Sequence, residues 1–272
     1  MVRRPAVAGY FYPAAALELQ RDVEDLTRVR ALPAAAPQAA HAVIVPHGSY
    51  RHAGSMIGQT LASVAVPRRC IILGPSHTGS WMSWSLMSDG AYRTPLGDVP
   101  IDTACASGLQ ARCPFLASDA WAQRGEHAIE VLVPFLQRLG PEDLSLVPVI
   151  TSSSEEAEFA QLATALAQVV RLQEEPVLLI ASTDLSHYTS VALGAAYDHA
   201  LLRCLCDVDG PALRQAVKAQ AIRMCGDQVA ACVADAAREL GARRGRVIAY
   251  GTSADAGGDP DSVTGYAGVL IE

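Results

Sequence analysis

The chain has 272 residues, 50% of them hydrophobic, with a formal net charge of -7 and a pI near 5.5. This length and apolar content favour one large core, and the acidic balance with scattered Lys and Arg argues against a nucleic-acid surface, so a small-molecule or protein partner is expected. No apolar segment approaches the roughly 18 uninterrupted residues that suggest a membrane span, so we expect a soluble protein without a membrane partner.

The N-terminal region indicates a cytoplasmic start rather than an export signal. Arg3-Arg4 could open such a signal, but Tyr10, Tyr12 and Pro13 break the stretch before a continuous apolar run develops. Further along, residues 33–40 are rich in Ala and Pro and predict a surface connection.

Short apolar runs rich in Val and Ile alternate with helical patterns, as expected for strands in a sheet that is covered on both faces. Because no repeat or low-complexity linker divides the chain, we predict a single α/β domain over residues 1–272, with a central mixed β-sheet flanked by helices. The predicted buried strands are residues 43–45, 70–73, 144–150, 177–181 and 247–250, and a last strand lies near 266–271.

Four helical segments follow from apolar spacing and end signals. A Ser153-x-x-Glu156 capping box opens the pattern over 155–172. Asp209 is placed to cap a helix that starts at Gly210-Pro211. Pro134 interrupts the pattern over 126–139 and predicts a kink or two shorter pieces, 227–240 is closed by Gly241, and 253–262 is a loop.

Seven cysteines, an odd number spread through the chain, indicate a reducing compartment rather than a disulfide framework. Cys225 stands apart, because Cys225-Gly226-Asp227 precedes a helix and the positive end of the helix dipole favours a thiolate. The others are predicted to be small apolar packing residues: Cys70, Cys105, Cys113, Cys204, Cys206 and Cys232.

Polar residues gather where predicted strands end. His47 follows the strand at 43–45, His77 follows 70–73, and Asp184 follows 177–181. Open α/β sheets bind ligands at the carboxyl ends of their strands. We therefore expect these side chains to share one site.

Four of the seven histidines lie next to small or turn-forming residues, namely His47, His77, His127 and His187. Two of them are paired with carboxylates, as Glu126-His127 and Asp184-x-x-His187, and carboxylates orient and polarise imidazoles. The remaining histidines, His41, His52 and His199, are expected to be ordinary surface or hydrogen-bonded side chains.

Two chemistries fit this set. Cys225 could be a covalent nucleophile activated by a histidine with Asp184 behind it. Alternatively, two imidazoles and one thiolate could hold a redox or Lewis-acidic metal with open positions for substrate. The spacing of the residues leaves both chemistries open.

At these residues the sequence resembles the Memo family, whose bacterial members are often called AmmeMemoRadiSam system protein B. The matching motifs run over essentially the whole chain and are specific when taken together. They are residues 8–13, 45–50, 73–77, 92–97, 126–130 with Pro134-Phe135, 182–187, 224–226 and 261–267.

The resemblance implies a fold similar to that of class III extradiol dioxygenases, non-haem iron enzymes that open catechol rings with two His and one carboxylate as iron ligands. In Memo-like proteins a Cys takes the place of the carboxylate. Carried over by motif, the ligands would be His47, His77 and Cys225. The acid-base group would be His127 beside Glu126 and His187 steered by Asp184.

The function implied is that of a non-haem iron(II) oxidoreductase acting on a small molecule, with copper or zinc as competing ions because the thiolate is soft. The alternatives are a copper-handling or signalling protein that binds without turnover, and a zinc-type hydrolase. The sequence departs from the usual family pattern at Gly48-Ser49, Ala128 and Gln228, which affects the expected shape of the pocket mouth.

Overall fold

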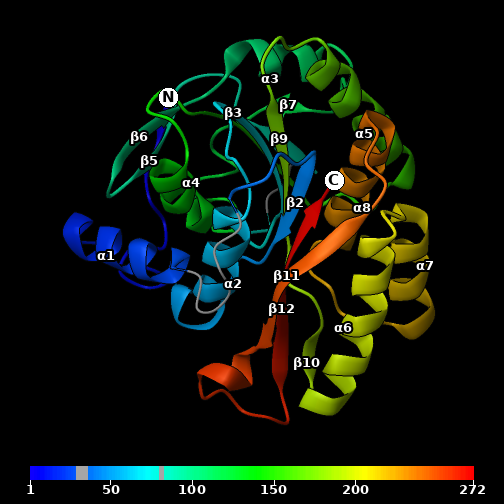
Figure 1. Ribbon diagram of the computed structural model, residues 1–272. Helices are drawn as coiled ribbons and strands as arrows, with labels where there is room; N and C mark the ends of the chain where they lie inside the picture. The colour runs from blue at the N-terminus through cyan, green and yellow to red at the C-terminus, as the bar shows by residue number, and fades with distance from the viewer. Residues whose placement is uncertain (29–35, 80–82) are drawn as a thin grey trace.

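Parallel strands form the middle of a large mixed sheet in the computed structural model, which describes residues 1–28, 36–79 and 83–272 (Figure 1). The central order is β2 (Ala42–Val45), β9 (Val177–Ser182), β3 (Arg69–Pro75) and β8 (Ser145–Thr151), and each neighbouring pair is parallel. All but one of their residues are buried, which agrees with their continuous apolar runs. The four predicted central strands are therefore confirmed.

Antiparallel strands on both sides make the sheet mixed, as predicted. β12 (Val263–Ile271) runs antiparallel to β2, and it also pairs with β10 (His187–Thr189) and β11 (Gly245–Thr252). On the other side β4 (Trp84–Leu86) is antiparallel to β8, and β7 (Ala117–Ser118) pairs with the far edge of β4 in parallel.

The predicted strand at 247–250 exists within β11, but the prediction that it is buried is wrong. β11 pairs with β12 along one side and most of its residues are half-buried or exposed, with Val247 at 37%. A short apolar run has the same pattern at the edge of a sheet as at its centre, so periodicity alone does not place the strand.

Helices cover both faces of the sheet, and each face has its own hydrophobic core (Figure 1). β3 shows the division, because Ile71 and Leu73 enter one core while Cys70 and Ile72 enter the other. One core includes α1 (Ala16–Thr27), α2 (Tyr50–Ala62) and α4 (Val133–Leu139); the other includes α3 (Thr103–Gln110), α5 (Glu156–Arg171), α6 (Val191–Cys206), α7 (Gly210–Gln220) and α8 (Asp227–Leu240). No helix in the described part of the chain is long and apolar enough to cross a membrane.

A separate three-stranded sheet is formed by β1 (Val2–Arg3), β5 (Ala91–Thr94) and β6 (Gly97–Pro100). Of the predicted surface connection at 33–40, residues 36–39 are exposed, while 33–35 lie outside the described residues.

The helix-start predictions have different outcomes. Asp209 accepts a hydrogen bond from the Ala212 N–H and caps α7, as predicted. The capping box at Ser153 is wrong: α5 starts one residue after Glu155, and the Ser153 hydroxyl donates to Glu158 instead. Ser153 lies too far before the helix to cap it, so its oxygen accepts only from the Glu155 N–H.

The remaining helical predictions agree better with the structure. The segment over 126–139 is divided into the 3-10 turn η1 (Glu130–Leu132) and α4, with Pro134 in the first turn of α4. α8 ends at Gly241, whose φ of 114° is left-handed. The predicted loop at 253–262 contains one additional element, the 3-10 turn η2 (Ser253–Ala256).

The close approach of α2 to β12 requires a glycine. A Cβ atom at Gly268 would overlap Thr60 Oγ1, which donates to the Met56 carbonyl within α2. We expect Gly268→Ala to lower the free energy of unfolding by about 1–3 kcal/mol, because the Thr60 side chain is fully buried and cannot move aside freely. Chemical denaturation measures this change.

Gly108→Ala in α3 is the matched control. Its added Cβ would only touch Val169 at 3.4 Å, and alanine favours a helix over glycine by roughly 0.5–1 kcal/mol. Equal effects of the two substitutions would contradict the steric explanation.

Candidate metal centre

A cavity of about 440 Å³ opens at the carboxyl ends of the central strands. His47 follows β2, His77 follows β3 and Asp184 follows β9, and all three side chains line this cavity. The sequence-based expectation that strand ends bring these residues together is confirmed. The full lining is Tyr10, Phe11, His47, Gly48, Ser49, His52, His77, His127, Asp184, His187 and Tyr266.

His47 is the most enclosed imidazole of the cavity, and its tautomer follows from its neighbours. The Ser182 hydroxyl lies 2.9 Å from His47 Nδ1 and uses its own hydrogen on the Ala128 carbonyl, at 2.5 Å. His47 Nδ1 must therefore carry the proton, which leaves the Nε2 lone pair free. Burial, and then the charges of His77 and His127, lower the pKa of His47 well below its usual value, so the ring is neutral, the form that binds metals.

The buried carboxylate of Glu126 orients two imidazoles. Its Oε1 atom lies 2.9 Å from His77 Nδ1 and 3.3 Å from His127 Nδ1, and it accepts the backbone N–H groups of His127 and Ala128. Burial opposes ionisation, but the hydrogen bonds from His77 and Ala128 prevail and lower the pKa of Glu126 to about 2. The sequence suggested a partner for His127, whereas the shorter contact is with His77.

Cys225 joins the cluster from the segment before α8. Its Sγ atom lies 3.4 Å from His47 Nε2 and accepts the Asp184 N–H at 3.2 Å. Burial, and then the charge of Asp184, raise the pKa of the thiol. The expectation that the helix start alone favours a thiolate is therefore wrong, and a bound cation would be needed to favour the ionised form.

His187 and Asp184 lie close to each other without a direct hydrogen bond. His187 Nε2 is 3.8 Å from Asp184 Oδ2, and His187 Nδ1 faces the backbone carbonyls of Leu185 and Arg223 at 3.0 and 3.2 Å. Because carbonyl groups only accept, His187 Nδ1 carries the proton and Nε2 is the free nitrogen. Burial raises the pKa of Asp184. The steering role predicted for Asp184 stays a prediction.

Within the described residues, two groups of side chains have ligand atoms that all lie within 4.8 Å of one another. One is His47, His77 and His127, and the other is His47, Asp184 and Cys225. His47 belongs to both, and the predicted trio of His47, His77 and Cys225 is divided between them. Neutral imidazoles and a thiol are donors that suit iron, copper or zinc, so the residues present fit a metal ion.

Several residues that shape the cavity were not found from the sequence. The Phe11 ring contacts the His127 ring edge-on at 4.8 Å between centroids, and Tyr266 covers another wall. His52, expected to be an ordinary histidine, lines the cavity with its Nδ1 atom 2.9 Å from Ser49 Oγ. The available signal was the Ser49-x-x-His52 spacing, which places both side chains on one side of a first helical turn.

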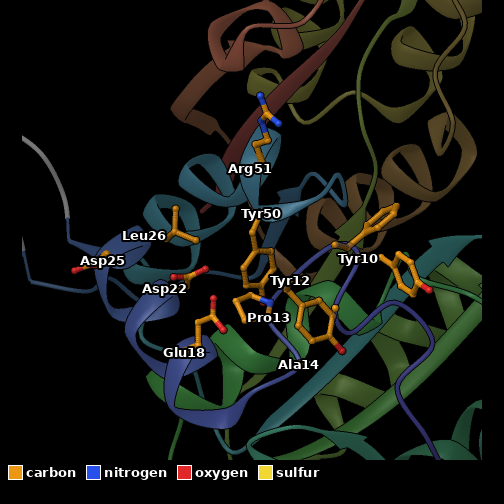
Figure 2. Close-up of a pocket in the computed structure, with 12 residues that line it drawn as sticks. Tyr10, Tyr12, Pro13, Ala14, Glu18, Asp22, Asp25, Leu26, Tyr50 and Arg51 are labelled. Atoms are coloured by element: carbon orange, nitrogen blue, oxygen red, sulfur yellow. The ribbon is translucent and has the colours of Figure 1, made fainter.

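A second cavity of about 530 Å³ lies between the N-terminal segment, α1 and α2 (Figure 2). It shares Tyr10 and Phe11 with the cavity of the histidines, and α1 contributes the carboxylates of Glu18, Asp22 and Asp25. None of its described lining residues is a histidine or cysteine. Although it is larger, it is not the candidate metal centre.

We expect Glu126→Gln to weaken metal binding by roughly 10- to 100-fold, as is typical when the partner that orients a ligand is lost. Both oxygens of the Glu126 carboxylate accept N–H groups, from the His77 ring and from the backbone. A glutamine replaces one of these oxygens with an NH₂ group, which cannot accept, so His77 and His127 lose their fixed orientation. Titration of the metal-free protein with Co²⁺ measures the change.

Glu158→Gln is the matched control, since Glu158 is also a hydrogen-bonded carboxylate, held by Trp84 and Ser153. It contributes to neither group of ligand atoms, so wild-type affinity is expected. A similar loss in both variants would show that Glu126 has no specific role.

Comparison with known proteins identifies the family of this chain. Residues 3–270 match the family described as Memo-like protein. A MEMO1 family protein of Methanopyrus kandleri is 33% identical over 280 residues, covering 100% of this chain and 99% of that protein, and one of Aquifex aeolicus is 31% identical with 99% of each covered. A crystal structure of an uncharacterized protein from Escherichia coli K12 has a similar fold, with a TM-score of 0.56, 15% identity, and coverage of 85% of this chain and 99% of that one. The chain belongs to the Memo family.

Proposed function

We propose that the protein is a metal-dependent oxidoreductase that holds one non-haem iron(II) ion at His47, His77 and Cys225 and acts on a small molecule. One observation carries the proposal: His47, in the cavity of the histidines, lies beside both the His77 ring and the Cys225 thiol. His47 Nε2 lies 3.4 Å from Cys225 Sγ, and the His47 and His77 rings are 5.0 Å apart between centroids. Three protein ligands leave further positions on such an ion open.

When bound, iron(II) would supply a redox-active ion on which a substrate and O2 can meet. The chain itself supplies two proton-handling imidazoles. His187 Nε2 is free to accept a proton from substrate, because Nδ1 is held by backbone carbonyls. His127, with Nδ1 beside Glu126, is placed to take up a proton at Nε2 and then return it to product.

The walls of the cavity favour a small, partly apolar ligand. Phe11 and Tyr266 supply aromatic surface beside the histidines, and Tyr10, which is 87% exposed, stands at the outer side. All seven cysteines are free, which supports a reducing compartment, and we propose the cytoplasm.

The test is to purify the protein without oxygen, measure the bound metal, and record O2 uptake over a panel of catechols. Wild type is expected to hold iron and to consume O2 with at least one member of the panel. Cys225→Ala is expected to lose O2 uptake because the thiolate ligand is gone, whereas His187→Ala keeps the iron and loses uptake by about 100-fold or more, the usual range for an acid-base group.

Each other outcome points to a different function. Bound copper without turnover would indicate sequestration, and zinc with esterase or amidase activity would indicate a hydrolase. A wild-type protein that binds none of these metals would refute the proposal.

A further inference from the structure

We infer that the centre has a second metal-binding mode, in which His127 replaces Cys225 as the third ligand and the ion is held by three imidazoles. The inference rests on the proposed metal-binding function, because it assigns a second use to the same cavity. It differs from that proposal in treating His127 as a ligand rather than only a proton-handling group.

The distances place the three imidazoles in one group. Ligand atoms of His47, His77 and His127 already lie within 4.8 Å of one another, and the His77 and His127 rings are 4.5 Å apart between centroids. Cys225 instead groups with His47 and Asp184. A metal held by His77 and Cys225 together needs one of these two side chains to approach the other.

The contacts of the Nδ1 atoms leave the other ring nitrogen of all three imidazoles available to a metal. Nδ1 of His47 donates to Ser182, and Nδ1 of both His77 and His127 faces the ionised Glu126 carboxylate, at 2.9 and 3.3 Å. The hydrogen bonds of His47 and His77 place the proton on Nδ1 and leave an Nε2 lone pair, and the Nδ1 atom of His127 faces the same carboxylate. This is the arrangement in which an outer carboxylate fixes the tautomer and raises the basicity of a metal-binding histidine.

The two modes differ in the ions that they accept. Three imidazoles suit divalent ions such as zinc and cobalt and leave an open coordination position, whereas a thiolate adds affinity for softer ions, copper(I) above all. The second mode therefore keeps divalent ions bound when the thiol is removed or blocked, while copper(I) depends on Cys225.

The experiment is a double-mutant cycle on the full-length, metal-free protein titrated with Co²⁺. The variants are Cys225→Ser, His127→Ala and the double variant, with His199→Ala as control because His199 bonds the Ala195 carbonyl on α6 and does not line the cavity. Each single substitution leaves a complete set of three ligands, so only a modest loss of affinity is expected. The double variant is expected to lose on the order of 10- to 100-fold more than the product of the two single effects, and the control to match wild type.

A second readout identifies the ligands directly. In the Co²⁺ form of Cys225→Ser, proton NMR is expected to show three exchangeable, paramagnetically shifted ring N–H signals, one from each Nδ1 of His47, His77 and His127. The double variant, with whatever Co²⁺ it still binds, is expected to show two. A parallel titration with copper(I) is expected to show a large loss in Cys225→Ser and little change in His127→Ala.

Specific results would overturn the inference. If Cys225→Ser alone loses Co²⁺ as completely as the double variant, or shows only two shifted N–H signals, His127 is not a ligand, while metal binding by wild type would still uphold the proposed function. If wild type binds neither Co²⁺ nor copper(I), the proposed function fails as well. Thermal unfolding checks each variant, and His127→Gln replaces His127→Ala if the alanine variant does not fold.

Discussion

His47→Ala is expected to reduce metal affinity more than any other single substitution in the cavity, by well over the roughly 10- to 100-fold that loss of an orienting partner causes. His47 is the one residue shared by both groups of ligand atoms, so neither group keeps three members without it. Its ring is also 1% exposed and neutral, so no water or nearby side chain readily takes its place. Metal analysis and Co²⁺ titration of the anaerobically purified variant measure the loss.

His199→Ala is the control for this experiment. His199 lies on α6, where its Nδ1 contacts the Ala195 carbonyl at 2.6 Å, and it does not line the cavity. It is expected to bind metal as wild type does. Full metal occupancy in His47→Ala would show that the ligand assignment is wrong.

Arg3→Met is expected to lower the free energy of unfolding by about 3–5 kcal/mol, because it leaves a buried carboxylate without its counter-charge. Arg3 and Glu130 are both fully buried and form an ion pair. Arg3 also donates to the Gln123 carbonyl at 3.2 Å and packs on the Tyr92 ring, 4.7 Å from its centroid. Denaturant titration monitored by circular dichroism measures the change.

The destabilisation caused by Arg3→Met would extend to the cavity through the N-terminal segment. Glu130 accepts the N–H groups of Ala6 and Val7 at 2.7 and 3.0 Å and the Tyr12 hydroxyl at 2.6 Å. These bonds fix the segment that carries Phe11 against His127. We therefore expect the double variant Arg3→Met/Glu130→Gln to recover part of the stability, since the unpaired charge is removed.

The exposed pair of Arg93 and Asp98 provides the comparison, with two contacts of 2.6 and 2.7 Å. Arg93→Met is expected to cost less than about 1 kcal/mol, because solvent screens exposed ion pairs. If Arg3→Met costs no more than Arg93→Met, burial of the Arg3–Glu130 pair does not determine its contribution.

The central strands and the ends at which His47, His77 and Asp184 lie were predictable, because continuous apolar runs and Pro or Gly terminators are local signals. Cys225 required the family resemblance, since its neighbours along the chain do not reveal that its thiol meets His47 across the sheet, 3.4 Å away. The least reliable prediction was the assignment of a carboxylate partner to a histidine from its neighbours in the sequence. Glu126 was matched with His127 next to it, yet its shorter contact is with His77, 49 positions away.

The errors at Ser153 and in β11 have a similar origin. Ser153 fits the capping pattern locally, but α5 begins at Glu156 with Glu155 as its N-cap residue, so Ser153 lies before the helix start. β11 has a core-like composition and becomes an edge strand because it pairs with β12 alone among the named strands. In both cases the local sequence pattern did not determine the structure.

The carboxylate that two rings share limits how this centre can change. A substitution at Glu126 disturbs His77 and His127 together, so affinity for an ion and the basicity of the neighbouring imidazole cannot be adjusted independently at that position. Independent adjustment would have to come from groups that touch one ring only, such as Ser182 at His47 or Phe11 at His127. An engineer who wishes to alter metal preference while preserving the orientation of these rings would start with those contacts and leave residue 126 unchanged.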